Sequence, residues 1–282
     1  MLITMTGDTD LVTVGIPFYN AEKTLSAAIE SVLHQTYTNL EVILINDGSR
    51  DSSLAIAESF IKDKRVKLFS DGLNQGLAKR LNQITVNASG IYIARMDADD
   101  VMDKKRIEIQ INYLNAHKNI DLLGSSAIII NEKSNIIGKL KMPSYPNSSD
   151  EIFFLNSFFI HPTVIGKKSF FQKNQYNDTF RDFSEDRELW LRTYKTSNFY
   201  NLSDNFLLFY RQPKKINIKT YIRRNMNLIK VFKMYSCNLP SKNSLLKLTL
   251  IVYIKITITW VLSLLHLTIL LNKIKYNNQT IK

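Results

Sequence analysis

The chain has 282 residues, of which 45% are hydrophobic and 22% charged, a balance typical of a folded globular protein and not of a disordered one. Its length allows one large domain, or one domain with an appendage. Cys237 is the single cysteine, which excludes an intramolecular disulfide and fits a reducing compartment. The first ten residues have no basic segment and no long apolar run, so we expect no signal peptide and a cytoplasmic protein.

The net charge of +12 is concentrated at the C-terminal end of the chain. Residues 213–282 contain 13 Lys or Arg and no acidic residue, which leaves 24 basic against 25 acidic residues in 1–212. We therefore expect two regions, a near-neutral body at 1–212 and a basic helical region at 213–282. The excess of positive charge predicts an anionic partner for the second region, either membrane lipid or nucleic acid.

Strand-like and helix-like segments alternate along the first hundred residues. Apolar, β-rich runs predict four strands, at residues 11–16, 40–45, 65–69 and 90–96. Apolar residues at helical spacing predict three helices between them, at residues 20–37, 53–62 and 76–89. Asn20 is expected to cap the first of these helices. This order, with short connections, predicts right-handed βαβ units and a mostly parallel sheet with both faces covered.

The second half of the chain is less regular. A short strand that continues into a helix is expected over residues 161–171. Helical spacing predicts further helices at residues 106–117, 185–196 and 215–235. Apolar runs predict further strands at residues 122–130, 136–142 and 205–211.

Polar turns follow three of the predicted strands, at residues 17–20, 46–49 and 97–100. Because ligands of parallel α/β sheets bind beyond the carboxyl ends of the strands, these turns should converge on one site. Asp97 and Asp99 are hard oxygen ligands of the kind that suits Mg²⁺ or Mn²⁺ shared with substrate phosphates. A solvated Asp-rich turn is the alternative, and the position at a strand end favours metal.

Five segments, in order, resemble a family 2 glycosyltransferase with the nucleotide-sugar-binding GT-A fold. They are residues 12–53, "NQGLAKRLN", "SGIYIARMDADD", "HPTVI" and "EDRELWLR". The match covers residues 11–192, with a looser match to Arg211. The resemblance implies a Rossmann-like α/β fold, with a mixed, mainly parallel sheet flanked by helices and followed by the basic helical tail.

The same resemblance implies a donor site. Tyr19 is expected to lie against the nucleotide base, with Pro17 and Glu22 nearby. Asp47 is expected to accept a hydrogen bond from the uracil or ribose, although Asn46 replaces the first of two acids common at this turn. Arg80 is expected to reach the nucleotide or its phosphates, because a guanidinium suits oxyanions.

Metal and catalytic roles follow in the same way. Asp99 is the expected direct metal ligand, Asp97 leans toward the ribose, and Asp100 is expected to be only a turn or capping acid. Asp186 matches the general base, although without the resemblance Asp186 is better explained as a first-turn helix acid. His161 could contact the diphosphate or the acceptor, and a structural histidine is an equal alternative.

The expected activity is inverting, metal-dependent transfer of a hexose or N-acetylhexosamine from a nucleoside diphosphate sugar, with UDP expected as the nucleotide. The acceptor is a hydroxyl of a saccharide or lipid-linked saccharide in lipopolysaccharide, O-antigen or capsule biosynthesis. One alternative is a catalytically silent sugar-nucleotide fold whose basic tail binds membrane or nucleic acid; the sequence shows no nucleic-acid-binding motif. A nucleotidyltransferase is a third, which "EDRELWLR" disfavours.

Residues 248–271 are the most hydrophobic stretch of the chain. Lys255 and His266 interrupt it, and with Thr259 and Ser263 they fall on one weakly polar helix stripe. We expect a helix in the membrane interface with its lysines drawn to anionic lipid, which places the enzyme peripherally at the inner face of the plasma membrane. A docking helix, an oligomer contact and a single membrane span remain alternatives.

Overall fold

The structure is a computed structural model that describes residues 10–145, 157–181, 183–213, 217–238 and 242–265. Three sequence predictions concern residues that lie partly outside these ranges. They are the expectation of no signal peptide, the start of the basic helix at 215, and the apolar stretch beyond residue 265.

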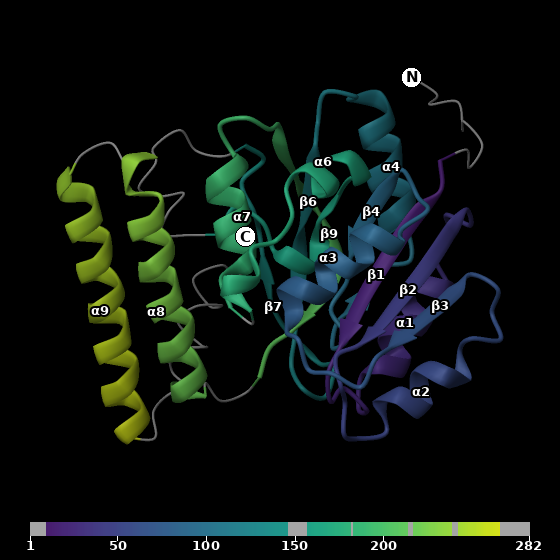
Figure 1. The fold of residues 1–282 in the computed structure, drawn as a ribbon, viewed down its shortest axis with the longest axis horizontal. Coiled ribbons are helices and arrows are strands. Elements are labelled where there is room, and N and C mark those ends of the chain that lie inside the picture. Colours follow the sequence, from purple (N-terminus) through teal and green to yellow (C-terminus); the bar gives the residue numbers. More distant parts are fainter. Residues whose placement is uncertain (1–9, 146–156, 182, 214–216, 239–241, 266–282) are drawn as a thin grey trace.

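Among the described residues, nine strands form one sheet, and helices cover both of its faces (Figure 1). The strands are β1 (Val12–Phe18), β2 (Leu40–Asn46), β3 (Val66–Ser70), β4 (Tyr92–Arg95), β5 (Val101–Met102), β6 (Leu122–Ile130), β7 (Ile136–Leu140), β8 (Ile165–Lys167) and β9 (Phe199–Arg211). Their order in the sheet is β3-β2-β1-β4-β8-β6-β9-β5, and β7 pairs with β6 at the side.

The first four strands are parallel, as the alternating sequence pattern predicts. In the register of β1, Phe18 lies opposite Asn46 of β2, and Gly15 lies opposite Arg95 of β4. The turns after these three strands therefore leave the sheet at the same edge. The second half adds antiparallel pairs through β8, β7 and β5, with β6 and β9 parallel to each other.

Side chains on β2 show why both faces of the sheet are buried. Val42 and Leu44 belong to one hydrophobic cluster, whereas Ile43 and Ile45 belong to a second cluster on the opposite face. The first cluster contains residues of α1 (Leu25–Leu33), α2 (Ser53–Ser59) and α4 (Arg106–Ala116). The second contains residues of α3 (Leu77–Asn87), α6 (Lys168–Lys173), α7 (Glu185–Thr193), α8 (Ile218–Met234) and α9 (Lys242–Leu264).

Asn20 does not cap the first helix, because α1 begins at Leu25. Its backbone has a left-handed φ of 49°, which asparagine tolerates better than most residues. The Asn20 side chain instead accepts a hydrogen bond from the backbone N–H of Arg50, at 2.8 Å. Asn20 therefore ties the turn after β1 to the turn after β2.

The C-terminal helices α8 and α9 stand side by side at the end of the molecule opposite β3 (Figure 1). Leu228 and Phe232 of α8 and Leu248 and Val252 of α9 share a hydrophobic cluster with Trp190 of α7. Helices α8 and α9, which belong to the region expected as an appendage, thus share part of their core with the preceding domain.

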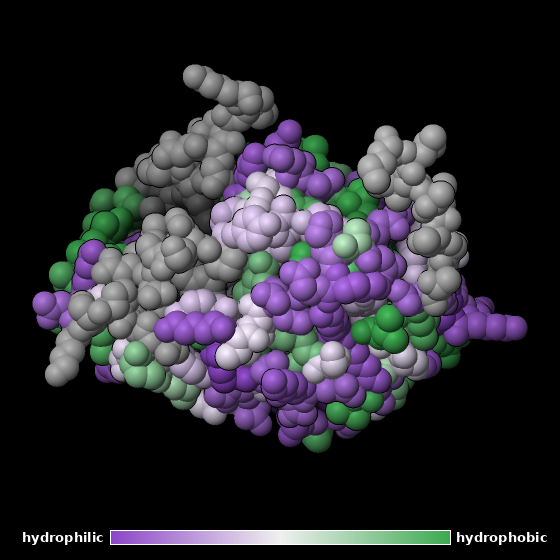
Figure 2. All heavy atoms as spheres, turned by 90° about the horizontal axis from the view of Figure 1, so that it is seen from above, coloured by the Kyte–Doolittle hydropathy of each residue, from purple (hydrophilic) through white to green (hydrophobic). Residues whose placement is uncertain are grey.

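The weakly polar stripe of α9 is only partly exposed: Lys255 reaches solvent, whereas Ser263 is half-buried. Thr259 is buried, and its hydroxyl donates to the backbone oxygen of Lys255. Large apolar side chains are exposed instead: Leu246, Leu250, Tyr253, Ile254, Ile258, Trp260, Val261 and Leu264. Figure 2 shows hydrophobic residues gathered at this end of the molecule. Within the described chain, α9 is the one helix whose length and composition alone would allow it to cross a membrane.

Candidate active site

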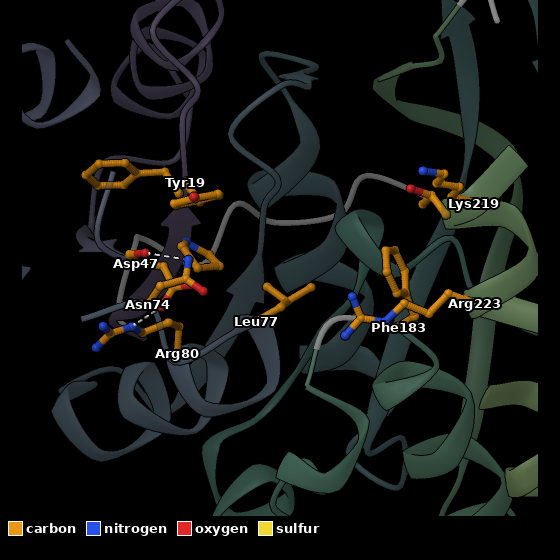
Figure 3. Close-up of a pocket in the computed structure, with 11 residues that line it drawn as sticks. Tyr19, Asp47, Asn74, Leu77, Arg80, Phe183, Lys219 and Arg223 are labelled. Atoms are coloured by element: carbon orange, nitrogen blue, oxygen red, sulfur yellow. Dashed lines mark hydrogen bonds and ion pairs between the residues drawn. The ribbon is translucent and has the colours of Figure 1, made fainter. Parts of the chain in front are cut away.

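A cleft of about 500 Å³ opens beside the end of β1, a size typical of small-molecule sites. Pro17 and Tyr19 follow β1 into one wall, and Tyr19 keeps 48% of its surface exposed. Figure 3 shows Tyr19, Asp47, Asn74 and Arg80 on one side of the cleft, and Phe183, Lys219 and Arg223 on the other.

Asp47, at the end of β2, organises the loop that leads into α3. Its carboxylate accepts hydrogen bonds from the backbone N–H groups of Gln75 (2.7 Å) and Gly76 (3.1 Å), and from Nε of Arg80 (2.8 Å). Gly76 has a φ of 88°, and a Cβ there would lie 2.1 Å from Cγ of Arg181, so only glycine fits. Asp47 thus fixes the loop before α3 at this wall of the cleft.

Arg80 is almost fully buried, at 1% exposure. Besides bonding Asp47, its terminal nitrogens donate to both carboxylate oxygens of Asp71, at 2.7 and 2.8 Å. They also donate to the side-chain oxygen of Gln83 and the backbone oxygen of Leu73. The guanidinium donors thus face protein oxygens in this structure, and a contact of Arg80 with the nucleotide or its phosphates stays a prediction.

Glu22 does not line this cleft in the structure. Its carboxylate accepts from the backbone N–H of Ser52 at 3.1 Å, while its own N–H donates to Asp51. Asn46 has a comparable local role: its side-chain oxygen accepts from the backbone N–H of Ser49, and its amide donates to Ser70. Both side chains shape the turns that surround the cleft.

Three carboxylates gather directly after β4. Asp97, Asp99 and Asp100 each offer an oxygen within 4.8 Å of the others. Asp99 reaches solvent. Partial burial of its carboxyl and the negative charge of Asp97 nevertheless raise the pKa of this carboxyl to about 6. Asp100 is buried and accepts from the backbone N–H of Arg211 at 2.7 Å.

The chemistry of this group fits a divalent cation. Hard carboxylate oxygens at this spacing suit Mg²⁺ or Mn²⁺. Among the described residues, Oδ2 of Asp100 is buried without a hydrogen-bond partner, and burial together with Asp97 and Asp99 raises its pKa well above the ordinary value. Asp100 was expected to be only a turn or capping acid; it is also a member of the candidate metal group.

Arg95, the last residue of β4, is a site residue that the sequence reasoning missed. It is buried, and its guanidinium pairs with both oxygens of Asp97, at 2.5 and 2.6 Å. The signal was available, because Arg95 is the one charged residue in the predicted strand 90–96. A charge inside an otherwise apolar strand needs a partner.

Asp186 lies in the first turn of α7, where it is half-buried and accepts from the backbone N–H of Arg187 at 2.7 Å. Glu185 beside it is buried, and burial followed by the charge of Asp186 raises the pKa of Glu185 to about 8. Arg95 interacts electrostatically with Glu185 as well as with Asp97. It therefore connects the carboxylates after β4 with Glu185 of α7.

His161 is buried beside these acids and does not line the cleft. Its Nε2 lies 2.9 Å from the hydroxyl of Tyr176, and its Nδ1 lies 3.6 Å from Oε1 of Glu185. Burial, together with the charge of Arg95, lowers the pKa of His161 well below its ordinary value. Both ring nitrogens face protein groups, which is the geometry of the structural alternative.

Solved structures with the same fold define the class. The structure of TarS residues 1–349 from S. aureus, in complex with UDP-GlcNAc, has a TM-score of 0.64 at 18% identity, covering 84% of this chain and 70% of that one. The mannosyltransferase PcManGT from Pyrobaculum calidifontis, in complex with GDP-Man and Mn²⁺, has a TM-score of 0.62 at 15% identity, covering 89% and 71%. The predicted fold is thus confirmed, and it is the GT-A fold of glycosyltransferases.

Sequence comparisons define the family. The model of glycosyl transferase family 2 matches residues 13–175. An uncharacterized glycosyltransferase of Methanocaldococcus jannaschii is 31% identical over 85% of this chain and 83% of its own length. An O-antigen biosynthesis glycosyltransferase of Escherichia coli, WbnJ, is 32% identical over 65% of this chain and 71% of its own. The chain belongs to glycosyl transferase family 2.

Proposed function

We propose that this protein transfers a hexose or N-acetylhexosamine from a nucleoside diphosphate sugar to a hydroxyl of a saccharide or lipid-linked saccharide, with inversion. One observation carries the proposal: Asp97, Asp99 and Asp100 gather at the same sheet edge as the cleft beside Tyr19 and Asp47. TarS with UDP-GlcNAc and PcManGT with GDP-Man support a nucleotide-sugar donor. UDP is our first candidate for the nucleotide.

In the proposed reaction, Asp186 accepts the proton of the acceptor hydroxyl while that oxygen attacks the anomeric carbon. The bond from this carbon to the diphosphate breaks on the opposite face, and its electron pair leaves with the nucleoside diphosphate, so one displacement gives inversion. Asp97 and Asp99, with Asp100 beside them, would hold Mn²⁺ or Mg²⁺. A bound ion would neutralise the charge of the leaving diphosphate.

The remaining residues are proposed to hold the nucleoside. Tyr19 is exposed in the cleft beside Pro17, which supports a contact between its ring and the base. Asp47 and Arg80 are already bonded to each other and to the loop before α3, which supports a positioning role for Arg80. Glu22, bonded to Ser52, is proposed to support the same wall.

The C-terminal helices support a membrane location. We propose residues 1–212 as the catalytic domain and 213–282 as a membrane-facing region at the inner face of the plasma membrane. The exposed apolar face of α9, its basic surroundings and the O-antigen relative support this placement, with surface polysaccharide as the product. A catalytically silent protein that binds membrane through the same tail is the alternative.

The purified full chain incubated with Mn²⁺, a panel of UDP- and GDP-sugars and candidate saccharide acceptors tests the proposal. Mass spectrometry should show one donor consumed, a nucleoside diphosphate released and the acceptor heavier by one sugar with the opposite anomeric configuration. Retained configuration would contradict the mechanism. A protein that binds donor and never turns it over with any acceptor would favour the silent alternative.

A further inference from the structure

The second wall of the cleft comes from the region expected to be a membrane tail. Lys219, Thr220 and Arg223 line the cleft from the first two turns of α8. Residues four apart on a helix share one face, so Lys219 and Arg223 point the same way. The Arg223 guanidinium lies 5.8 Å from the ring centroid of Phe183, and Figure 3 shows it directed toward the middle of the cleft.

The charges around this cleft favour an anion. Its charged lining residues are Asp47 and Arg80, which are paired with each other, and two further cations, Lys219 and Arg223. Asp47 is bonded to Arg80 and to backbone N–H groups, so its charge is already compensated on the opposite wall. A cleft with an excess of one sign raises the local concentration of ligands of the other sign.

We infer that Lys219 and Arg223 of α8 bind the diphosphate of the donor, opposite the wall that holds Tyr19 and Asp47. The inference rests on the proposed function and deepens it, because it assigns a binding role to the C-terminal region. An arginine fork can donate two hydrogen bonds to phosphate oxygens, and Phe183 beneath it would keep the guanidinium in place. Asn217 caps α8 and orients the helix start, since its side chain accepts from the N–H of Thr220 at 3.1 Å.

Calorimetric titration of the full chain with UDP, GDP and uridine, in Mn²⁺ and in EDTA, tests the assignment. Arg223→Ala and Lys219→Ala should each weaken nucleoside diphosphate binding by about tenfold, the effect of about 1.4 kcal/mol from a lost charged contact. Uridine binding should stay within about twofold of wild type, since uridine carries no phosphate. The effect should persist in EDTA, because it does not pass through a metal.

Lys230→Ala is the matched control, because Lys230 lies on the same helix, is exposed and is not part of the cleft lining. It should leave UDP binding within about twofold of wild type. An unchanged UDP affinity in Arg223→Ala, an equal loss for uridine, or an equal loss in Lys230→Ala would each overturn the inference while leaving the proposed function standing. A wild-type chain that binds neither UDP nor GDP would overturn both.

Discussion

Arg95 forms a two-pronged ion pair with Asp97, at the point where β4 leaves the sheet. The arginine is buried, whereas 28% of the Asp97 side chain remains exposed to solvent. The acidic turn therefore contains its own positive charge, which compensates one carboxylate of the three. A divalent ion would then have only Asp99 and Asp100 left to neutralise, and Asp97 is held in one orientation before any donor arrives.

Replacing Arg95 by methionine should destabilise the fold. Breaking a fully buried ion pair costs about 3–5 kcal/mol, and we expect about 2 kcal/mol here because water still reaches Asp97. Urea unfolding at neutral pH measures the loss. Adding Asp97→Asn to Arg95→Met should recover part of it, since the uncompensated carboxylate is then gone. A double variant as unstable as the sum of the two single variants would show that the pair is not coupled.

Asp186→Asn should remove sugar transfer while leaving donor binding intact. Loss of a general base lowers the rate by about 10²–10⁴-fold, because the acceptor hydroxyl keeps its proton. Turnover and UDP affinity are measured on the same preparation, and UDP affinity should stay within about twofold of wild type. Asp204→Asn, at an exposed acid paired with Lys141, is the control and should keep wild-type turnover. Near-normal turnover in Asp186→Asn would disprove the assignment.

Metal dependence should reside in Asp99. We expect EDTA to abolish transfer by the wild-type enzyme and to weaken its UDP binding, with both restored by Mn²⁺. Asp99→Asn should bind UDP about tenfold more weakly than wild type in Mn²⁺ and equally well in EDTA. Calorimetry under both conditions compares them. Donor binding and transfer that are indifferent to EDTA would remove the metal from the proposal.

Glu185 should make stability fall as the pH rises. Its carboxyl titrates near pH 8 in the folded protein and near its ordinary value of 4.5 when unfolded. Between these values the folded state binds a proton that the unfolded state has released, so the free energy of unfolding decreases with increasing pH. Glu185→Gln has no carboxyl that titrates in this range. The free energy of unfolding of this variant, relative to wild type, should therefore increase by at least about 1 kcal/mol between pH 5 and pH 8. Chemical unfolding across this range measures the difference, and parallel curves would contradict the prediction.

The outer face of α9 should carry membrane binding. Three apolar side chains of α9 are about half exposed: Leu250, Ile254 and Ile258. Their spacing of four places them on one stripe of the helix. Replacing all three by serine should reduce sedimentation with anionic vesicles by about tenfold or more, because the apolar contact is lost. The control replaces three exposed apolar residues of the catalytic domain, Ile61, Val86 and Ile91. Equal losses in both triple variants would indicate that α9 has no special role.

Local pattern alone predicted much of the protein. A short apolar run predicted β2 and a period of 3.6 predicted α3, both from consecutive residues. Burial of both sheet faces follows from apolar runs such as residues 42–45. The carboxylates at 97–100 could be placed at the edge of the sheet because parallel strands end on the same side. The helix boundary at Asn20 was wrong, because the bond between Asn20 and Arg50 joins residues that only the fold brings together.

Partners distant in the sequence were decided by the tertiary structure alone. From the sequence, Arg80 could be an exposed helix charge, and only the fold brings Asp47 to its Nε. His161, in η1 (His161–Thr163), likewise meets Tyr176 and Glu185 only in the folded chain. Helical spacing predicted α8 as a basic helix, but only packing shows that its first turns line the cleft. The sequence determines which residues can form an element, whereas the charge and burial of a side chain depend on what the fold places opposite it.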